Sequence, residues 1–136
     1  MKICLELIVH TMLEEEIFYR ACREVGVEED LMDEADLEHD SAKVLIAELE
    51  HGKPDDDCYD AKVKVLSEGI KHHVKEEVQR DGLFAQAKSK GVDLVAVGEM
   101  MVARKKQLLA EIDENSLPTP VTQTMRADAV ERRQHA

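Results

Sequence analysis

The stretch EGIKHHVKEEV, Glu68–Val78, continues an amphipathic helix and places two ionisable residues on its apolar face. Alternate steps of three and four residues through the preceding turns select Tyr59, Val63, Leu66 and Ile70. This spacing is typical of a buried helical seam. The next two steps fall on His73 and Glu77. An imidazole and, one turn later, a carboxylate therefore occupy positions at which the pattern predicts apolar side chains.

Two further predicted helices show the same replacement of apolar residues by ionisable ones. In the helix expected from about Ile3 to Glu24, the seam consists of Ile3, Leu7, His10, Glu14, Ile17 and Ala21. In the helix expected from about Asp30 to Glu50, the seam consists of Ala35, His39, Ala42, Ile46 and Leu49. Three helices are therefore predicted to bring together His10, Glu14, His39, His73 and Glu77.

These five residues together favour a metal site. A single histidine on a helical seam is more often a hydrogen-bonded core residue, and a glutamate on an acidic helix is usually solvated. Two His-x-x-x-Glu pairs, however, place two ligands on one face of each helix, and a cation offsets the cost of burying their carboxylates. Three imidazoles and two carboxylates without a thiolate suit iron, manganese or zinc better than calcium or magnesium. His72 points about 100° away from His73 on the helix and is placed outside the site, as are His51 and His135.

The composition of the chain and the positions of its helix-ending residues predict an all-α protein. Among 136 residues there are two Tyr, two Phe, no Trp, six Gly and three Pro, which is typical of helices with aliphatic cores. A third helix is expected to end near Arg80, and a fourth runs from about Leu94 to Ile112. We expect one helical domain over residues 1–114, followed by a flexible tail over residues 115–136, where two prolines interrupt a stretch without periodicity.

The charge and the cysteines exclude several other classes of protein. Thirty acidic and eighteen basic residues give a net charge of -12, which disfavours nucleic acid and anionic membranes as partners. The first apolar run is too short for a signal peptide or a membrane span, so we expect a cytoplasmic protein. The odd set of Cys4, Cys22 and Cys58 contains no Cys-x-x-Cys pair and favours reduced, packing cysteines.

Taken together and in this order, several segments resemble the hemerythrin-like domains of bacteria, also named HHE cation-binding domains. IVHTMLEEEIFYRA (8–21) resembles the second core helix of that family. EADLEHDSAKVLIAELE (34–50) resembles the third core helix, and VLSEGIKHHVKEE (65–77) the fourth. LVAVGEMMVARKKQLL (94–109) is similar to the segment that follows. The resemblance covers about residues 3–111.

The resemblance implies an up-and-down helical bundle around a non-haem diiron centre. By position it assigns the iron ligands His10, Glu14, His39, His73 and Glu77. It also makes the carboxylates of Glu14 and Glu77 the candidates to bridge the two metals. The family's first core helix, which brings a further histidine ligand, has no counterpart here, and VQRDGLFAQ (78–86) departs from the family pattern. We therefore expect three core helices plus a C-terminal helix, a homo-oligomer that covers the exposed flank, and an incomplete metal site in the isolated chain.

Three functions remain open at this point. The first is a diiron protein that handles dioxygen or hydrogen peroxide, with peroxide decomposition of the catalase type as the candidate activity. The second is a sensor of iron or oxygen, and the third is a metal-free structural bundle that derives from such a domain. The fold alone does not choose among them.

Overall fold

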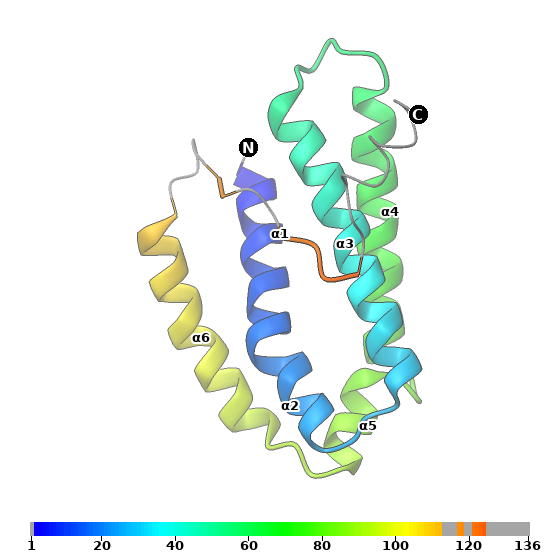
Figure 1. Ribbon diagram of the computed structural model, residues 1–136, viewed down its shortest axis with the longest axis vertical. Helices are drawn as coiled ribbons and strands as arrows, with labels where there is room; N and C mark the ends of the chain where they lie inside the picture. The colour runs from blue at the N-terminus through cyan, green and yellow to red at the C-terminus, as the bar shows by residue number, and fades with distance from the viewer. Residues whose placement is uncertain (1, 113–116, 119–120, 125–136) are drawn as a thin grey trace.

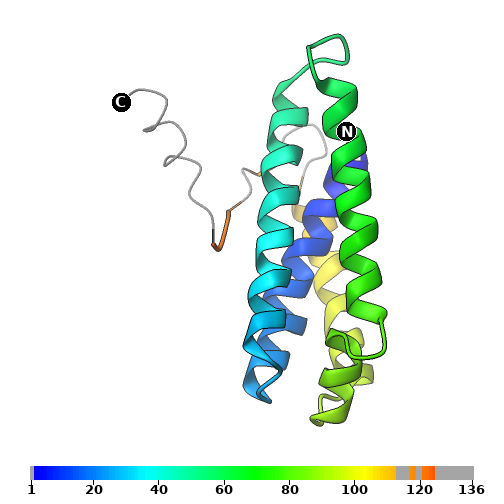
Figure 2. The ribbon, with the colours of Figure 1, turned by 90° about the vertical axis from the view of Figure 1, so that its right-hand side faces the viewer.

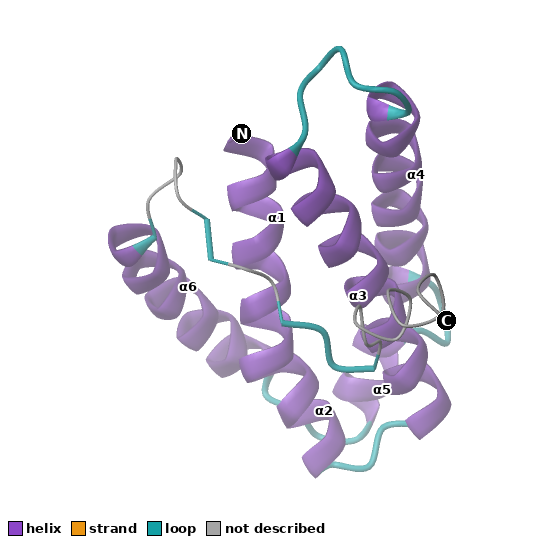
Figure 3. Ribbon diagram, turned by 45° about the horizontal axis from the view of Figure 1, so that its top comes forward, coloured by secondary structure: helices purple, strands orange, loops and turns teal. Residues whose placement is uncertain are grey.

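The computed structural model describes residues 2–112, 117–118 and 121–124. Within these residues the chain forms α1 (Lys2–Leu13), η1 (Glu14–Phe18), α2 (Tyr19–Glu24), α3 (Glu29–His51), α4 (Tyr59–Val78), α5 (Leu83–Ser89) and α6 (Leu94–Glu111). Figure 3 draws only helices and loops over this described part of the chain. The prediction of an all-α helical bundle is confirmed.

The long helices alternate in direction, so the bundle has up-and-down topology (Figures 1 and 2). α1, η1 and α2 follow one another as one continuous rod, which packs against α3 and α6, while α4 packs mainly against α3 and α5. Figure 1 shows α6 and α4 on opposite sides of the pair formed by α1 and α3. The last long helix therefore covers α1 and does not close the side of the bundle between α1 and α4.

Three apolar clusters hold the helices together. Near the end of the bundle that contains α2 and α5, the buried members are Phe18, Tyr19, Cys22, Val27, Met32, Ala35, Leu83 and Ala87. Between α1, α3 and α4, they are Cys4, Ile8, Ile46, Leu49 and Leu66. Between α1 and α6, they are Leu5, Val9, Leu13 and Leu108. Full burial of each large aliphatic side chain contributes about 1.5–3 kcal/mol, so these clusters fix the helices around the residues that lie between them.

The seam predicted for the first helix is wrong at its N-terminal end. Ile3 is 60% exposed, whereas its neighbour Cys4 is wholly buried. The physical reason is that α1 packs between two helices and buries two lines of side chains, one toward α3 and one toward α6. The line through Ile3 and His10 consequently lies toward the open side of the bundle.

The described part of the C-terminal segment lies against α3. Lys43 Nζ donates a 2.7 Å hydrogen bond to the carbonyl oxygen of Val121. The wholly buried carboxylate of Asp40 accepts hydrogen bonds from the backbone N–H groups of Gln123 and Thr124 and from the Thr124 hydroxyl. Most of the predicted tail, with His135, lies outside the described residues, so its flexibility stays a prediction.

Two of the three cysteines are buried, as expected for packing residues. Cys4 and Cys22 are buried free thiols, and burial raises the pKa of Cys4 to about 11 and that of Cys22 to about 12. Their predicted packing role is confirmed, whereas Cys58 is exposed. None of the helices in the described ranges combines the length and the apolar character needed to cross a membrane.

Candidate metal centre

Four of the five residues selected from the sequence converge in the interior of the bundle. Glu14, His39, His73 and Glu77 are all buried, and each offers one ligand atom within 4.8 Å of the others. They come from η1, α3 and α4. His10 lies at the rim, where its side chain is 53% exposed and its Nε2 contacts Oε1 of Glu14. The fifth residue therefore reaches the cluster through Glu14.

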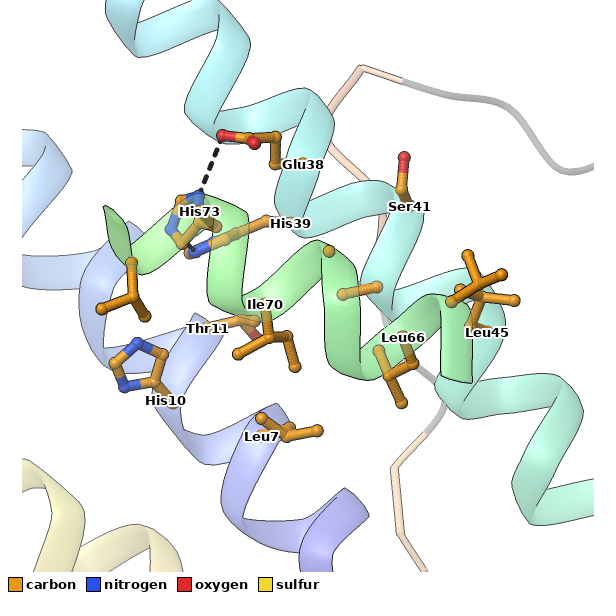
Figure 4. Close-up of a pocket in the computed structure, with 14 residues that line it drawn as sticks. Leu7, His10, Thr11, Glu38, His39, Ser41, Leu45, Leu66, Ile70 and His73 are labelled. Atoms are coloured by element: carbon orange, nitrogen blue, oxygen red, sulfur yellow. Dashed lines mark hydrogen bonds and ion pairs between the residues drawn. The ribbon is translucent and has the colours of Figure 1, made fainter. Parts of the chain in front are cut away.

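The two buried imidazoles turn the same nitrogen toward each other. The Nε2 atoms of His39 and His73 are 3.1 Å apart. On the opposite edge of each ring, Nδ1 of His39 lies 3.2 Å from Glu15 Oε2, and Nδ1 of His73 lies 3.1 Å from Glu38 Oε1 (Figure 4). A carboxylate partner holds a proton on Nδ1 and leaves the Nε2 lone pair free to bind a metal. Two such lone pairs at this distance repel each other unless a proton or a cation lies between or beside them.

Tyr19 occupies the middle of the cluster, and the sequence analysis did not select it. Its side chain is wholly buried, and its hydroxyl donates a 2.6 Å hydrogen bond to Oε1 of Glu77. The same oxygen lies 3.1 Å from Nε2 of His39 and 3.0 Å from Nε2 of His73. The ring stacks on the imidazole of His39 with a centroid distance of 5.1 Å. The phenol therefore touches three of the four converging residues.

A π-helical turn explains why Tyr19 faces the cluster. Steps of three and seven residues from Glu14 lead to Ile17 and Ala21, which were the positions chosen from the sequence. A π-turn forms i→i+5 hydrogen bonds and holds about one residue more than an α-helical turn, and π-turns occur often at functional sites. The π-turn Glu14–Phe18 thus brings Tyr19 onto the face of Glu14. An acidic run gives no reliable sequence signal for such a turn, so ordinary helical spacing misses this residue.

Glu14 is the least satisfied buried group of the cluster. Burial by itself raises the pKa of this carboxyl, but the contacts with His10 and His39 outweigh burial and hold the pKa well below its usual range. Its Oε1 lies 3.6 Å from Nε2 of His39. Neither carboxylate oxygen accepts a well-formed hydrogen bond from any residue in the described ranges. A buried, ionised carboxylate with open lone pairs is the environment that a cation stabilises.

The imidazoles respond to the same negative charge. Burial lowers the pKa of His39, but Glu14 and Glu15 more than compensate and the net shift is upward. Burial likewise opposes protonation of His73, whereas its contact with Glu77 raises the pKa to about 9. Without a metal, protons on the imidazoles therefore supply the positive charge that the cluster requires.

The second buried carboxyl behaves in the opposite way to Glu14. Burial raises the pKa of Glu77, its hydrogen bond with His73 opposes the shift, and the nearby Glu14 reinforces it. Two carboxylates this close to each other do not both ionise readily, so one of them retains a proton more easily. Burial and the charges of Glu14 and Glu77 also raise the pKa of Tyr19, which keeps its phenol protonated as a hydrogen-bond donor in the metal-free state.

A second group of ligand-type residues lies on the surface beside the first. It consists of Glu34, Glu38, His72 and Glu76. The His72 ring is 61% exposed and lies 3.0 Å from Oε1 of Glu76. Exposed acidic groups of this kind are ordinary on a helical surface, and Glu38 links this group to the buried cluster through its 3.1 Å contact with Nδ1 of His73. His72 itself lies outside the buried cluster.

Comparison of the chain with models of known protein families, with curated proteins and with solved structures found no match. The functional conclusion therefore depends on the residues and geometry of the buried cluster.

Proposed function

We propose that this chain is a hemerythrin-like protein that binds non-haem iron at the buried cluster and handles dioxygen or hydrogen peroxide there. The observation that carries the proposal is the pair of Nε2 atoms of His39 and His73, 3.1 Å apart, with a carboxylate on each Nδ1. Neutralising the negative charge of the cluster would not by itself require a carboxylate beside Nδ1 of each imidazole ring. Carboxylate partners of this kind are a regular feature of histidines that bind metals.

The donor set fits iron. Two buried imidazoles and two buried carboxylates converge, and His10 is close enough to Glu14 to add a third imidazole from the rim. Nitrogen and oxygen donors without a thiolate suit iron, manganese or zinc. Glu14 and Glu77 approach from different helices, so they are the candidates to bridge two ions in a diiron site.

The chain's own groups have separate roles in this proposal. Bound iron supplies the redox chemistry toward an O–O bond. Glu15 and Glu38 orient the two imidazoles from outside the cluster. Tyr19 holds a proton at its hydroxyl oxygen, within hydrogen-bond distance of Glu77, and can present that proton to a ligand in the cluster. Apolar clusters on both sides limit the access of water.

The test is iron loading under anaerobic conditions, followed by metal analysis and a visible absorption spectrum. His39→Ala should lose most of the bound iron, whereas His51→Ala should retain it. His51 is a matched control because it lies on the same helix, α3, at its exposed end. Turnover of hydrogen peroxide by the loaded protein would identify an enzyme, and iron binding without turnover would identify a sensor or carrier. Equal iron content in both variants would refute the proposed site.

A metal-free structural bundle is the second candidate, and Tyr19 is the observation that favours it. Its hydroxyl contacts His39, His73 and Glu77 and partly satisfies the cluster without a metal. Tyr19 does not satisfy Glu14, whose contacts with His10 and His39 are not well-formed hydrogen bonds, and this supports the preference for metal binding. Wild-type protein that binds none of iron, manganese and zinc after anaerobic loading would favour the second candidate.

A further inference from the structure

We propose that the cavity between α1, α3 and α4 binds a small organic molecule with a body about the size of one benzene ring and a single hydroxyl or hydroperoxide head. The head would face the candidate metal centre. This inference deepens the proposed function and depends on it for the role of the head group, because it identifies the class of molecule that the centre would meet.

The cavity has a volume of about 170 Å³ and two chemically different ends. Figure 4 shows His10, His39 and His73 gathered at one end, and Leu66 and Leu45 toward the other. The cavity thus runs from the buried cluster to an apolar end that opens to solvent beside Val65 and Val74, which are 55% and 45% exposed. Its lining is contributed by all three helices.

The apolar end offers almost no hydrogen-bonding partner to a guest. Leu7, Leu45, Leu66 and Ile70 form its walls. The Thr11 hydroxyl, which also borders the cavity, already donates a 2.8 Å hydrogen bond to the carbonyl oxygen of Ile8. Water is poorly held by such a surface, whereas an apolar group gains free energy by covering it.

The size of the cavity sets the size of the guest. An apolar cavity of about 150 Å³ in another protein accepts benzene, so this cavity suits one ring or a branched alkyl group of similar volume. Hydrogen peroxide alone would leave the apolar walls uncovered. A single oxygen-bearing head can form hydrogen bonds with the imidazoles at one end of the cavity, and an apolar body can cover the aliphatic walls at the other.

Two glycines provide a matched pair of variants for the test. Gly69 on α4 lines the cavity, and Gly98 on α6 lies outside it. At both positions an added Cβ would meet no atom within 4 Å. Gly69→Leu therefore adds a side chain at the lining of the cavity, while Gly98→Leu adds the same side chain outside it. Both variants replace a glycine inside a helix, so both gain up to about 1 kcal/mol of helix propensity. A difference in ligand binding between them therefore reflects the change in the cavity.

The experiment is an NMR titration of the full metal-free chain with benzyl alcohol, a redox-inert probe with the proposed shape. We expect millimolar binding by the wild type, at least tenfold weaker binding by Gly69→Leu, and unchanged binding by Gly98→Leu. Ala42→Leu narrows the same cavity from α3 and should also weaken binding, which keeps the test decisive if Gly69→Leu does not fold.

The inference is overturned if the wild type does not bind benzyl alcohol, or if the wild type and Gly69→Leu bind it equally. Where the wild type does not bind it and Gly69→Leu changes sedimentation, the cavity is a contact surface for a second copy of the chain. Iron content is measured separately on the same preparations. Probe binding without iron loading would refute the proposed function alone, and iron loading without probe binding would refute the cavity ligand alone.

Discussion

Replacement of Tyr19 by Phe removes one oxygen from the centre of the cluster and leaves the ring in place. In the metal-free protein the lost hydroxyl is the 2.6 Å donor to Glu77, and it also contacts both buried imidazoles. A hydrogen bond contributes about 0.5–3 kcal/mol according to the charge of its partners, and this loss also removes the contacts with both imidazoles, while Nε2 of His73 stays 2.8 Å from Oε1 of Glu77. We therefore expect Tyr19→Phe to lower the free energy of unfolding of the metal-free protein by about 2–3 kcal/mol.

The same substitution should cost much less once iron is bound. In the proposed site, His39, His73 and Glu77 would hold the metal, which would replace the contacts of the hydroxyl, so the expected loss falls below about 1 kcal/mol. The assay is urea unfolding followed by circular dichroism, with and without iron. With a slope of about 2 kcal/mol/M, the metal-free variant should unfold at a urea concentration lower by about 1–1.5 M.

Tyr59→Phe is the matched control, because Tyr59 is the other tyrosine of the chain and lies at the start of α4, outside the cluster. It should change the unfolding midpoint little in either state. The reasoning about Tyr19 is refuted if Tyr19→Phe unfolds at the same urea concentration as Tyr59→Phe in the absence of iron. An equal loss of stability with and without iron would show that the metal does not bind where the hydroxyl lies.

Three further predictions concern the neighbouring histidines, the thiols and self-association. His73→Ala should lose most of its iron and His72→Ala should retain it, as measured by metal analysis; equal retention would place the ligand elsewhere. At pH 8 one thiol per native chain, Cys58, should react rapidly with Ellman's reagent and all three after unfolding, because burial raises the pKa of Cys4 to about 11 and that of Cys22 to about 12. Fast reaction of two or three native thiols at pH 8 would contradict the described packing. Sedimentation at micromolar concentration should reveal a homodimer or larger assembly, since Val63 and Val78 of α4, which do not line the cavity, are 41% and 63% exposed; a stable monomer that retains two irons would refute this prediction.

The sequence by itself predicted the all-α bundle and four of the residues that converge. Steps of three and four residues along α3 and α4 led to His39, His73 and Glu77, which are buried. Glu14 was found in the same way because α1 is regular up to that residue. An ionisable residue at an apolar position of a helical pattern can be recognised from the local sequence alone. It predicted burial correctly at these four positions because burial depends mainly on the face of the helix. The predicted seam of α4 is wrong at Val63, which is 41% exposed, because the N-terminal half of α4 borders the open side of the bundle.

The tertiary structure alone decided which other groups complete the cluster. The π-turn after Leu13 moves Tyr19 into the centre, and regular helical spacing contains no information about that extra residue per turn. Glu15 and Glu38 reach Nδ1 of the imidazoles from different helices, so their roles depend on how η1, α3 and α4 are packed. His10 lies at the rim because α6 covers another face of α1 and leaves the side between α1 and α4 open. Sequence periodicity determines which face of a helix is buried, but only the packing of several helices determines which atoms meet.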